Sequence, residues 1–447
     1  GYAYVQVDSR GYGASEGCYD YGGKGEQMDA VAAVEWAARQ PWSNGNVGMW
    51  GKSYDAWTQV MALANKPSGL KAAVVQSPID DRYKIAFMNG IHYSAGWYAT
   101  PALYGAYDLA PPSANDSPPE EFLYPAKGTA TDPSCYAKHP IFSNTMYKRD
   151  MPYWQEGEIS GQARLSNVPI MWSHGFLDAN TKPDNFLDTW EGYRGWHRGW
   201  FGQYDHVRGN EHELVGRDGF LDEAMSFFDH FLAGKPLPKY PGRVEVQDGE
   251  GKWRTEKEWP PADADYDRGS LKILKGEYTD DSRNRADSAN GSWSFTQPAP
   301  YDMRFAGTPV LDVKVETTAP NQNLVALLYD VDGKEARLIS RGAFLLEQGG
   351  RATFELYPQD WILRKGHRFG ILLASNDSSW FTPIPTGLPV TITGGKMELP
   401  FLKFLRTPNL AGGPAKAMTQ VPDVSVDAKT IKQRTAKADF PPRLVRR

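Results

Sequence analysis

Hydrophobic and polar positions along the first 80 residues alternate between the period of a strand and the period of a helix. Alternation at 2–8 and apolar runs at 46–50 and 70–78 predict three strands, while apolar residues at helical spacing predict helices over 25–39 and 54–65. The positions that define the first helix are Met28, Val31, Ala32, Val34, Glu35 and Ala38. Strands that alternate with helices are typical of a parallel sheet with crossover helices.

This rhythm is interrupted from about residue 80 to 165, where aromatic residues and prolines replace the alternation and indicate an inserted, mostly helical cap. It resumes with strands predicted at 167–178 and 196–204 and helices predicted at 182–195 and 218–234. The apolar face of the last helix consists of Phe220, Leu221, Ala224, Phe227, Phe228, Phe231 and Leu232.

Beyond residue 240 the chain becomes short alternating segments separated by Gly, Asp and Pro, which predicts a β-sandwich or jelly roll. These segments are 243–253, 308–317, 323–333, 351–358, 367–375 and 388–393. The predicted domains are therefore an α/β core made of 1–79 and 165–236, a helical cap at 80–164, and a C-terminal β domain with a polar tail at 240–447.

The composition of the 447 residues narrows the classes of function. With 40% hydrophobic and 23% charged residues the chain has the balance of a soluble globular protein, and it contains no apolar stretch near the ~18 residues that span a bilayer. The net charge of −5 and the lack of a Lys- and Arg-rich stripe argue against nucleic acid as a partner. No zinc-ligand spacing occurs, and Cys18 and Cys135 can either pair or stay free.

The chain starts without an initiator methionine, directly on the alternating residues of a predicted strand. We therefore expect that it lacks upstream strands of the sheet together with any export signal, so that cytoplasmic and secreted locations both stay open. A homo-oligomer stays open as well.

Residues 44–57, NGNVGMWGKSYDAW, match parts of two different motifs. A phosphate-binding loop needs a glycine five residues before Gly51, and that position is Asn46. A serine-hydrolase nucleophile elbow needs a strand, a sharp turn that carries Ser and then a helix, and the residues around Ser53 provide all three. Asp55 replaces the last glycine of G-x-S-x-G, so a serine that merely caps the helix is the alternative interpretation.

A serine nucleophile needs a histidine base, and the histidine needs a carboxylate that fixes its tautomer. In the chain order Ser, Asp/Glu, His, Asp178 ends a predicted strand and starts a loop, whereas Asp184 and Asp188 fall inside the following helix. His206 follows the next strand, and His212 on the same loop is its main competitor. The other histidines lie in strands, the last helix, the cap or the C-terminal part: His92, His139, His174, His197, His230 and His367.

These residues stand in segments that resemble the cocaine esterase and X-Pro dipeptidyl-peptidase family of serine hydrolases, also called CocE/NonD hydrolases. VDSRGYGASEG at 7–17 resembles the family's D-x-R-G-x-G-x-S-x-G strand end, and GKSYDA at 51–56 resembles its G-x-S-Y-x-G elbow. HGFLD at 174–178 and GQYDH at 202–206 resemble its acid and histidine motifs. YPGRVEV, GKWRTEKEWPP and LRKGHRFGILLASNDSSWF resemble its C-terminal jelly roll, so the resemblance covers nearly the whole chain.

The resemblance implies an α/β-hydrolase core, a helical cap inserted between the nucleophile and acid strands, and a jelly-roll domain that leans on the active site. It implies Ser53 as nucleophile, His206 as general base and then acid, and Asp178 as the orienting partner of the histidine. Acyl transfer would then proceed through an acyl-enzyme and water, without metal or cofactor. The backbone N–H of Tyr54 would supply one oxyanion donor.

The sequence departs from the family pattern at two places. Ala56 replaces the glycine of the G-x-S-Y-x-G elbow, where a small residue should fit, while the position of Asp55 need not be Gly in this family. The family's second oxyanion donor is a tyrosine hydroxyl from a segment upstream of residue 1. Because the loss of one such donor costs about 10²–10³ in kcat, we expect the parent protein to be active and this chain alone to be weakly active or inactive.

Family members include X-Pro dipeptidyl-peptidases, α-amino-acid ester hydrolases, acylases and aryl esterases, so the expected partner is a small acyl ester or a short peptide. A substrate ammonium group would bind carboxylates, and those available in the cap region are Asp80, Asp81, Glu156 and Glu158. Tyr153 and Trp154, next to Glu156, are candidates for the wall of the substrate pocket, although such aromatic residues also serve as core.

Two classes outside the hydrolases stay open from the sequence. A catalytically inactive carbohydrate- or partner-binding protein would keep its function when Ser53 is replaced. A nucleotide-binding protein would be stabilised by ATP.

Overall fold

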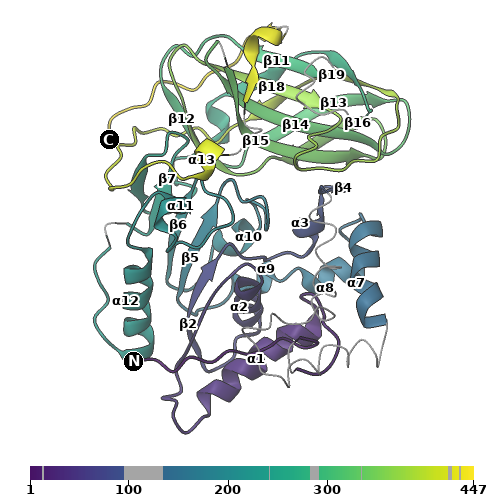
Figure 1. The fold of residues 1–447 in the computed structure, drawn as a ribbon. Coiled ribbons are helices and arrows are strands. Elements are labelled where there is room, and N and C mark those ends of the chain that lie inside the picture. Colours follow the sequence, from purple (N-terminus) through teal and green to yellow (C-terminus); the bar gives the residue numbers. More distant parts are fainter. Residues whose placement is uncertain are drawn as a thin grey trace.

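The computed structural model describes residues 1–12, 15–94, 134–240, 242–281, 291–333, 335–420, 425–431 and 434–447. Two parts lie one above the other in Figure 1: a part in which helices flank a mostly parallel sheet, and a part built from antiparallel strands. The cap elements lie beside the first part, below the β-rich part.

The first sheet has the strand order β1-β2-β5-β6-β7-β8, in which neighbours from β1 to β7 are parallel and β8 is antiparallel to β7. Its strands are β1 (Val47–Lys52), β2 (Leu70–Gln76), β5 (Ile170–Gly175), β6 (His197–Gly202), β7 (Val244–Gln247) and β8 (Trp253–Glu256). Strands β2, β5 and β6 are buried almost throughout, as expected for parallel strands that are covered on both faces. Because β1, β2, β5 and β6 are parallel, their carboxyl ends meet at one edge, where loops bring side chains together.

Helices cover both faces of this sheet. Alternate residues of β2 point to opposite sides: Ala73 and Val75 pack with α2 (Tyr54–Asn65), while Ala72 and Val74 pack with α12 (Phe220–Ala233). The helix α1 (Lys24–Ala38) lies on the α2 side. Its buried residues are Glu26, Gln27, Ala30, Val34 and Ala37, so the predicted apolar stripe that includes Met28 was misplaced, and Met28 is exposed.

Two predicted elements are wrong. Residues 2–8 form no strand, because no described strand pairs with them; Tyr4 stays 87% exposed and Tyr2 instead contacts Phe228 and Asp229 of α12. The helix predicted at 182–195 shrinks to α10 (Leu187–Trp190), because the preceding turns are organised around the carboxylate of Asp178.

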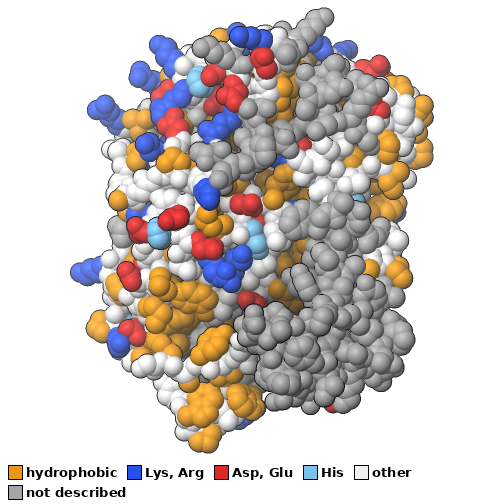
Figure 2. Space-filling model, viewed as in Figure 1, with side chains coloured by type: hydrophobic (Ala, Val, Ile, Leu, Met, Phe, Trp, Pro, Cys, Tyr) orange, Lys and Arg blue, Asp and Glu red, His pale blue; other side chains and the backbone are white. Residues whose placement is uncertain are grey.

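Figure 2 shows hydrophobic side chains gathered at the lower left, where the N-terminus and α12 lie in Figure 1.

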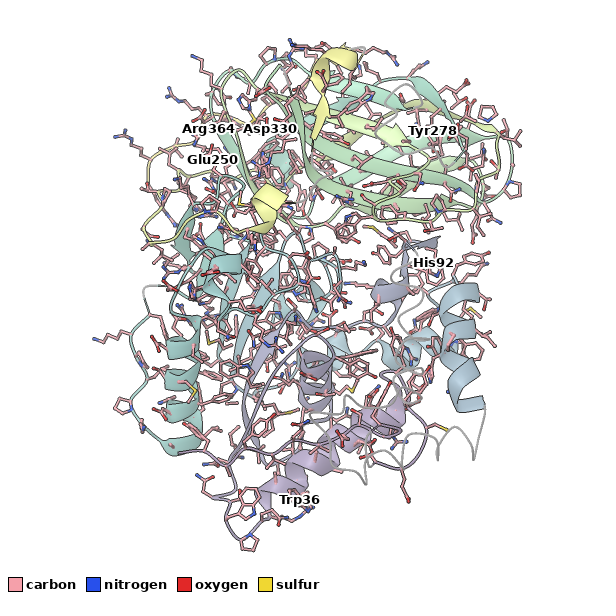
Figure 3. All side chains as sticks on the ribbon, in the orientation of Figure 1. Trp36, His92, Glu250, Tyr278, Asp330 and Arg364 are labelled. Carbon is pink, nitrogen blue, oxygen red and sulfur yellow. The ribbon has the colours of Figure 1, made fainter. Side chains whose placement is uncertain are left out.

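The described part of the cap combines short helices with a small hairpin. Its elements are α3 (Tyr83–Ala86), β3 (Phe87–Met88), β4 (Ile91–His92), α7 (Ser134–Thr145), α8 (Pro152–Gly157) and α9 (Ser160–Ala163). The rest of the predicted cap, residues 95–133, lies outside the described residues. His92, labelled in Figure 3 just below the β-rich part, joins the hairpin to α7 through a bond from Nε2 to the carbonyl oxygen of Ser143 (3.1 Å).

The β-rich part contains two main sheets packed face to face, as the alternating segments predicted. One sheet has the order β10-β19-β13-β16 with β9 beside β19, the other has the order β20-β15-β14-β18-β11-β21, and β12 pairs with β17. The strands are β9 (Ser270–Ile273), β10 (Gly276–Thr279), β11 (Ser292–Thr296), β12 (Met303–Gly307), β13 (Val310–Thr317), β14 (Gln322–Val331), β15 (Glu335–Leu346), β16 (Gly350–Glu355), β17 (Gln359–Leu363), β18 (Arg368–Ala374), β19 (Pro389–Glu398), β20 (Ser425–Asp427) and β21 (Thr435–Ala436). Inward residues from both sheets share one core, among them Val313 of β13 together with Leu324 and Leu328 of β14.

The two parts are joined through β7, β8 and β17. The sequence assigned 243–253 to the C-terminal domain, but β7 and β8 extend the first sheet, because β7 pairs with β6. Arg254 of β8 donates to both oxygens of the buried Asp360 of β17 (3.0 and 2.5 Å). In the same region Arg364 donates to Glu250 (2.6 Å), and Figure 3 shows the two side chains close together.

Candidate active site

Ser53 lies at the turn between β1 and α2 in a strained backbone conformation. Its φ of 64° and ψ of −123° fall outside the regions that a serine ordinarily adopts, as expected for a nucleophile elbow. The close approach of strand and helix requires glycine at position 51, where an added Cβ would lie 2.3 Å from the Cβ of Asp55. The Ser53 N–H donates to the carbonyl oxygen of Gln76 at the end of β2 (3.0 Å), which fixes the turn on the sheet.

Asp178 lies in the loop after β5 and is completely buried. Its Oδ1 accepts the backbone N–H groups of Asn180 (2.8 Å) and Thr181 (3.0 Å), and its Oδ2 accepts the Thr181 hydroxyl (3.0 Å). Burial by itself raises the pKa of this carboxyl, but the neighbouring His206 and the hydrogen bonds outweigh burial and hold the pKa below its usual range. Asp178 is therefore an ionised, rigidly held acceptor.

His206 follows β6 and bonds the carboxylate through Nδ1, which lies 3.0 Å from Oδ2 of Asp178. This bond puts the proton on Nδ1 and leaves Nε2 as the acceptor. The histidine loop is tied to the elbow twice: Lys52 Nζ donates to the His206 carbonyl oxygen (3.3 Å), and the Gly209 N–H donates to Oε1 of Gln76 (2.8 Å). The segments that carry Ser53 and His206 are thus held beside one another at the same edge of the sheet.

The rival acids and bases are engaged elsewhere. Asp188 forms an ion pair with Lys84 (2.8 Å), and Asp184 lies 3.9 Å from the same ammonium group. His212 is exposed and faces Asp218 (3.6 Å). His174 is buried and bonds the carbonyl oxygen of Lys182 through Nε2 (2.9 Å), so it supports the loop that follows Asp178.

Tyr54 is the first residue of α2, so its backbone N–H lies in the first turn of the helix, directly after Ser53. Such a group next to the serine suits an oxyanion donor. The phenol of Tyr54 donates to both oxygens of Glu26 (2.9 and 2.8 Å). Sequence reasoning missed Glu26, because an acidic residue in the first turn of a helix normally faces solvent.

The predicted pocket residues Tyr153, Trp154 and Glu156 lie on α8. Trp154 is 1% exposed and its indole N–H donates to the Met146 carbonyl oxygen (2.6 Å), while Tyr153 packs in the same aromatic cluster. Glu156 is partly exposed and accepts the Lys24 N–H at the start of α1 (2.9 Å). These contacts belong to packing and helix capping, and a part in substrate binding stays a prediction.

The other carboxylates proposed for a substrate ammonium group are engaged by the chain itself. Asp81 is buried and pairs with Arg149 (2.6 Å). Asp80 is buried and accepts the N–H and the hydroxyl of Thr189 (3.1 and 2.9 Å), and burial raises its pKa to about 7. Glu158 accepts the Ser160 N–H (3.1 Å).

A cavity of about 430 Å³ lies between the acid and base loops and the β-rich part. Its walls include Leu177 and Ala179, which flank the acid, and Asp205 and Val207, which flank the base, together with Trp380 of the β-rich part. Within the described ranges, no group of three or more His, Cys, Asp or Glu side chains is arranged to hold a metal ion. Across the same residues, every helix is too short or too polar to cross a bilayer.

Comparisons with known proteins found matching family models and similar proteins. Residues 1–208 match the model of the X-Pro dipeptidyl-peptidase (S15 family), and residues 238–421 match that of the X-Pro dipeptidyl-peptidase C-terminal non-catalytic domain. A Bacillus anthracis protein named "Putative Xaa-Pro dipeptidyl-peptidase" is 22% identical over 90% of this chain and 74% of its own length. The cocaine esterase of a Rhodococcus species is 25% identical over 60% of this chain and 51% of its own length.

A solved structure shares the fold. A CocE/NonD family hydrolase from Staphylococcus aureus superposes with a TM-score of 0.69 at 17% identity, over 88% of this chain and 79% of that chain. The α/β-hydrolase fold with a strand-rich C-terminal domain is thereby confirmed, whereas the absence of upstream strands stays a prediction.

Proposed function

Because the chain belongs to the X-Pro dipeptidyl-peptidase (S15) family of hydrolases, we propose that it cleaves an acyl ester or a peptide bond through Ser53, His206 and Asp178. The observation that carries the proposal is the bond of 3.0 Å between Nδ1 of His206 and the buried carboxylate of Asp178, beside a serine in a strained elbow.

In the proposed reaction the Ser53 hydroxyl oxygen attacks the substrate carbonyl carbon while Nε2 of His206 takes its proton. The developing oxyanion accepts the Tyr54 N–H, and Asp178 stabilises the imidazolium that forms. The protonated His206 then gives the proton to the leaving oxygen or nitrogen, which leaves an acyl group on Ser53. Water releases this acyl group by the same steps.

We propose a short peptide that begins with X-Pro, cleaved after the proline, or a small ester as the substrate, since the relatives carry both names. A dipeptidyl-peptidase must bind the substrate ammonium group, and Glu156 is the most exposed of the cap carboxylates considered. The cocaine esterase likeness favours the alternative of an aryl ester.

A substrate panel on the 447-residue chain tests the proposal. It compares kcat/KM for an Ala-Pro anilide, an α-amino-acid ester and an aryl ester, with Ser53→Ala as the blank. Turnover of one class that disappears in Ser53→Ala supports the proposal, whereas turnover that persists in Ser53→Ala refutes it.

A further inference from the structure

A buried carboxylate is hydrogen-bonded to the residue that follows the proposed nucleophile. Glu26, in the first turn of α1, is 1% exposed. Both of its oxygens accept the hydroxyl of Tyr54 (2.9 and 2.8 Å), and Oε2 also accepts the Gly22 N–H (2.6 Å). The three residues come from three different segments, so the carboxylate links the glycine-containing loop, α1 and the elbow.

The carboxylate of Glu26 accepts hydrogen bonds from neutral donors. Burial raises the pKa of Glu26, and the bonds from Gly22 and Tyr54 oppose that rise. Burial and the charge of Glu26 also hold the pKa of Tyr54 far above its usual value, which keeps the phenol a donor. Because the burial of a carboxylate costs stability unless hydrogen bonds compensate for it, core packing alone does not explain an acidic residue at this position.

The bond acts at a place where the backbone is strained. Ser53 holds a φ of 64° only because its surroundings impose it. On its N-terminal side the Ser53 N–H is fixed to the Gln76 carbonyl oxygen (3.0 Å), and on its C-terminal side the Tyr54 phenol is fixed to Glu26. The peptide between these two anchors carries the Tyr54 N–H.

The loop that supplies Gly22 is fixed in turn. Arg82, which is buried, donates to the Tyr21 carbonyl oxygen (2.9 Å) and to the carbonyl oxygen of Tyr153 in the cap. Gly22 cannot be replaced without movement, because an added Cβ would lie 2.0 Å from the Trp57 ring. The loop that donates the Gly22 N–H to Glu26 is therefore rigid.

From this geometry we infer that Glu26 is a positioning residue: through the Tyr54 phenol it aims the Tyr54 N–H at the oxyanion. The inference rests on the proposed function of Ser53 and Tyr54. Glu26 does not touch the substrate, so it should act on the chemical step and leave substrate binding unchanged.

The test is a double-mutant cycle on the full chain with Tyr54→Phe and Glu26→Leu, since glutamine would keep an amide oxygen that accepts the Tyr54 hydroxyl, whereas leucine has no acceptor. Each single variant should lower kcat about tenfold with KM within about twofold, because small misplacement of a reacting group is costly. The double variant should also lose about tenfold, because both changes break one bond. Titration with a fluorophosphonate counts the reactive sites, so that kcat refers to folded enzyme. Asp29→Asn, on the same helix but paired with Arg10 (2.5 Å), is the matched control and should keep kcat within about twofold.

Three results would overturn the inference: a wild-type kcat in Tyr54→Phe, a loss of about a hundredfold in the double variant, which is the product of independent effects, or a loss that appears in KM alone. If Glu26→Leu fails to fold, Tyr54→Phe still decides, because it removes the same bond and leaves the carboxylate in place. A failure of the proposed function is distinguishable, because Ser53→Ala would then keep its turnover.

Discussion

Replacing Asp178 by asparagine should stop catalysis while leaving the fold intact. Asn has the same shape, and its amide oxygen can keep the two backbone N–H bonds that Oδ1 now accepts from Asn180 and Thr181. Its NH₂ group then occupies the place of Oδ2, where it faces Nδ1 of His206. In that arrangement Nδ1 must accept, the proton moves to Nε2, and His206 can no longer take the proton of Ser53.

The magnitude follows from the alternative orientation of the amide. A flipped Asn would restore the correct histidine tautomer but would turn its NH₂ toward two backbone N–H groups, at about 1–3 kcal/mol for each unsatisfied group. The productive state is therefore about 2–6 kcal/mol less accessible, which at about 1.36 kcal/mol per tenfold corresponds to a loss of about 30-fold to 25,000-fold in kcat.

The assay measures kcat and KM on whichever ester or anilide the wild-type chain turns over, together with the midpoint of urea unfolding. Asp265→Asn in the β-rich part is the matched control and should keep the wild-type kcat: this side chain accepts the Asp267 N–H (3.0 Å), and an amide oxygen can keep that bond. A kcat for Asp178→Asn within tenfold of the wild type would refute the reasoning, since the tautomer would then not depend on this carboxylate.

Two further predictions concern stability. Gly51→Ala places a Cβ 2.3 Å from that of Asp55 and should lower the free energy of unfolding in urea by about 1–3 kcal/mol. In the control Gly161→Ala the added Cβ has nothing within 4 Å, so the free energy of unfolding should stay within about 0.5 kcal/mol of the wild type. Equal effects of the two changes would contradict the close approach at the elbow. Burial raises the pKa of Asp80 to about 7, above its value of about 3.9 in an unfolded chain, so the folded state binds the extra proton between these values. Stability should then fall as pH rises from about 4 to about 7, by up to about 1.4 kcal/mol per unit, and Asp80→Asn should remove this slope; an unchanged slope in pH-dependent unfolding would show that another group causes it.

The sequence was informative where one segment determines its own structure. The helix at 54–65 was predicted with the bounds that α2 has. Its apolar face, the turn before it and the break after it can all be recognised in this one segment of the sequence. Asp178 and His206 were found from their positions after strands, and the structure brings the two side chains into contact. Their catalytic roles stay predictions.

Features that depend on distant partners were not predictable. Residues 2–8 alternate like a strand, but no described strand pairs with them. The segment 243–253 alternates like the strands that follow it, yet it joins the first sheet because β7 pairs in parallel with β6. Glu26 is an acidic residue near the start of a helix, and its burial depends on Tyr54, which comes from a different helix.

The most direct test of the proposed chemistry is to identify the residue that a fluorophosphonate modifies in the 447-residue chain. The account predicts that mass spectrometry finds the phosphonyl group on Ser53, that Ser53→Ala prevents labelling, and that Asp178→Asn slows it by about 30-fold to 25,000-fold, in line with the tautomer argument. A label on another residue, or labelling that persists in Ser53→Ala, would contradict it.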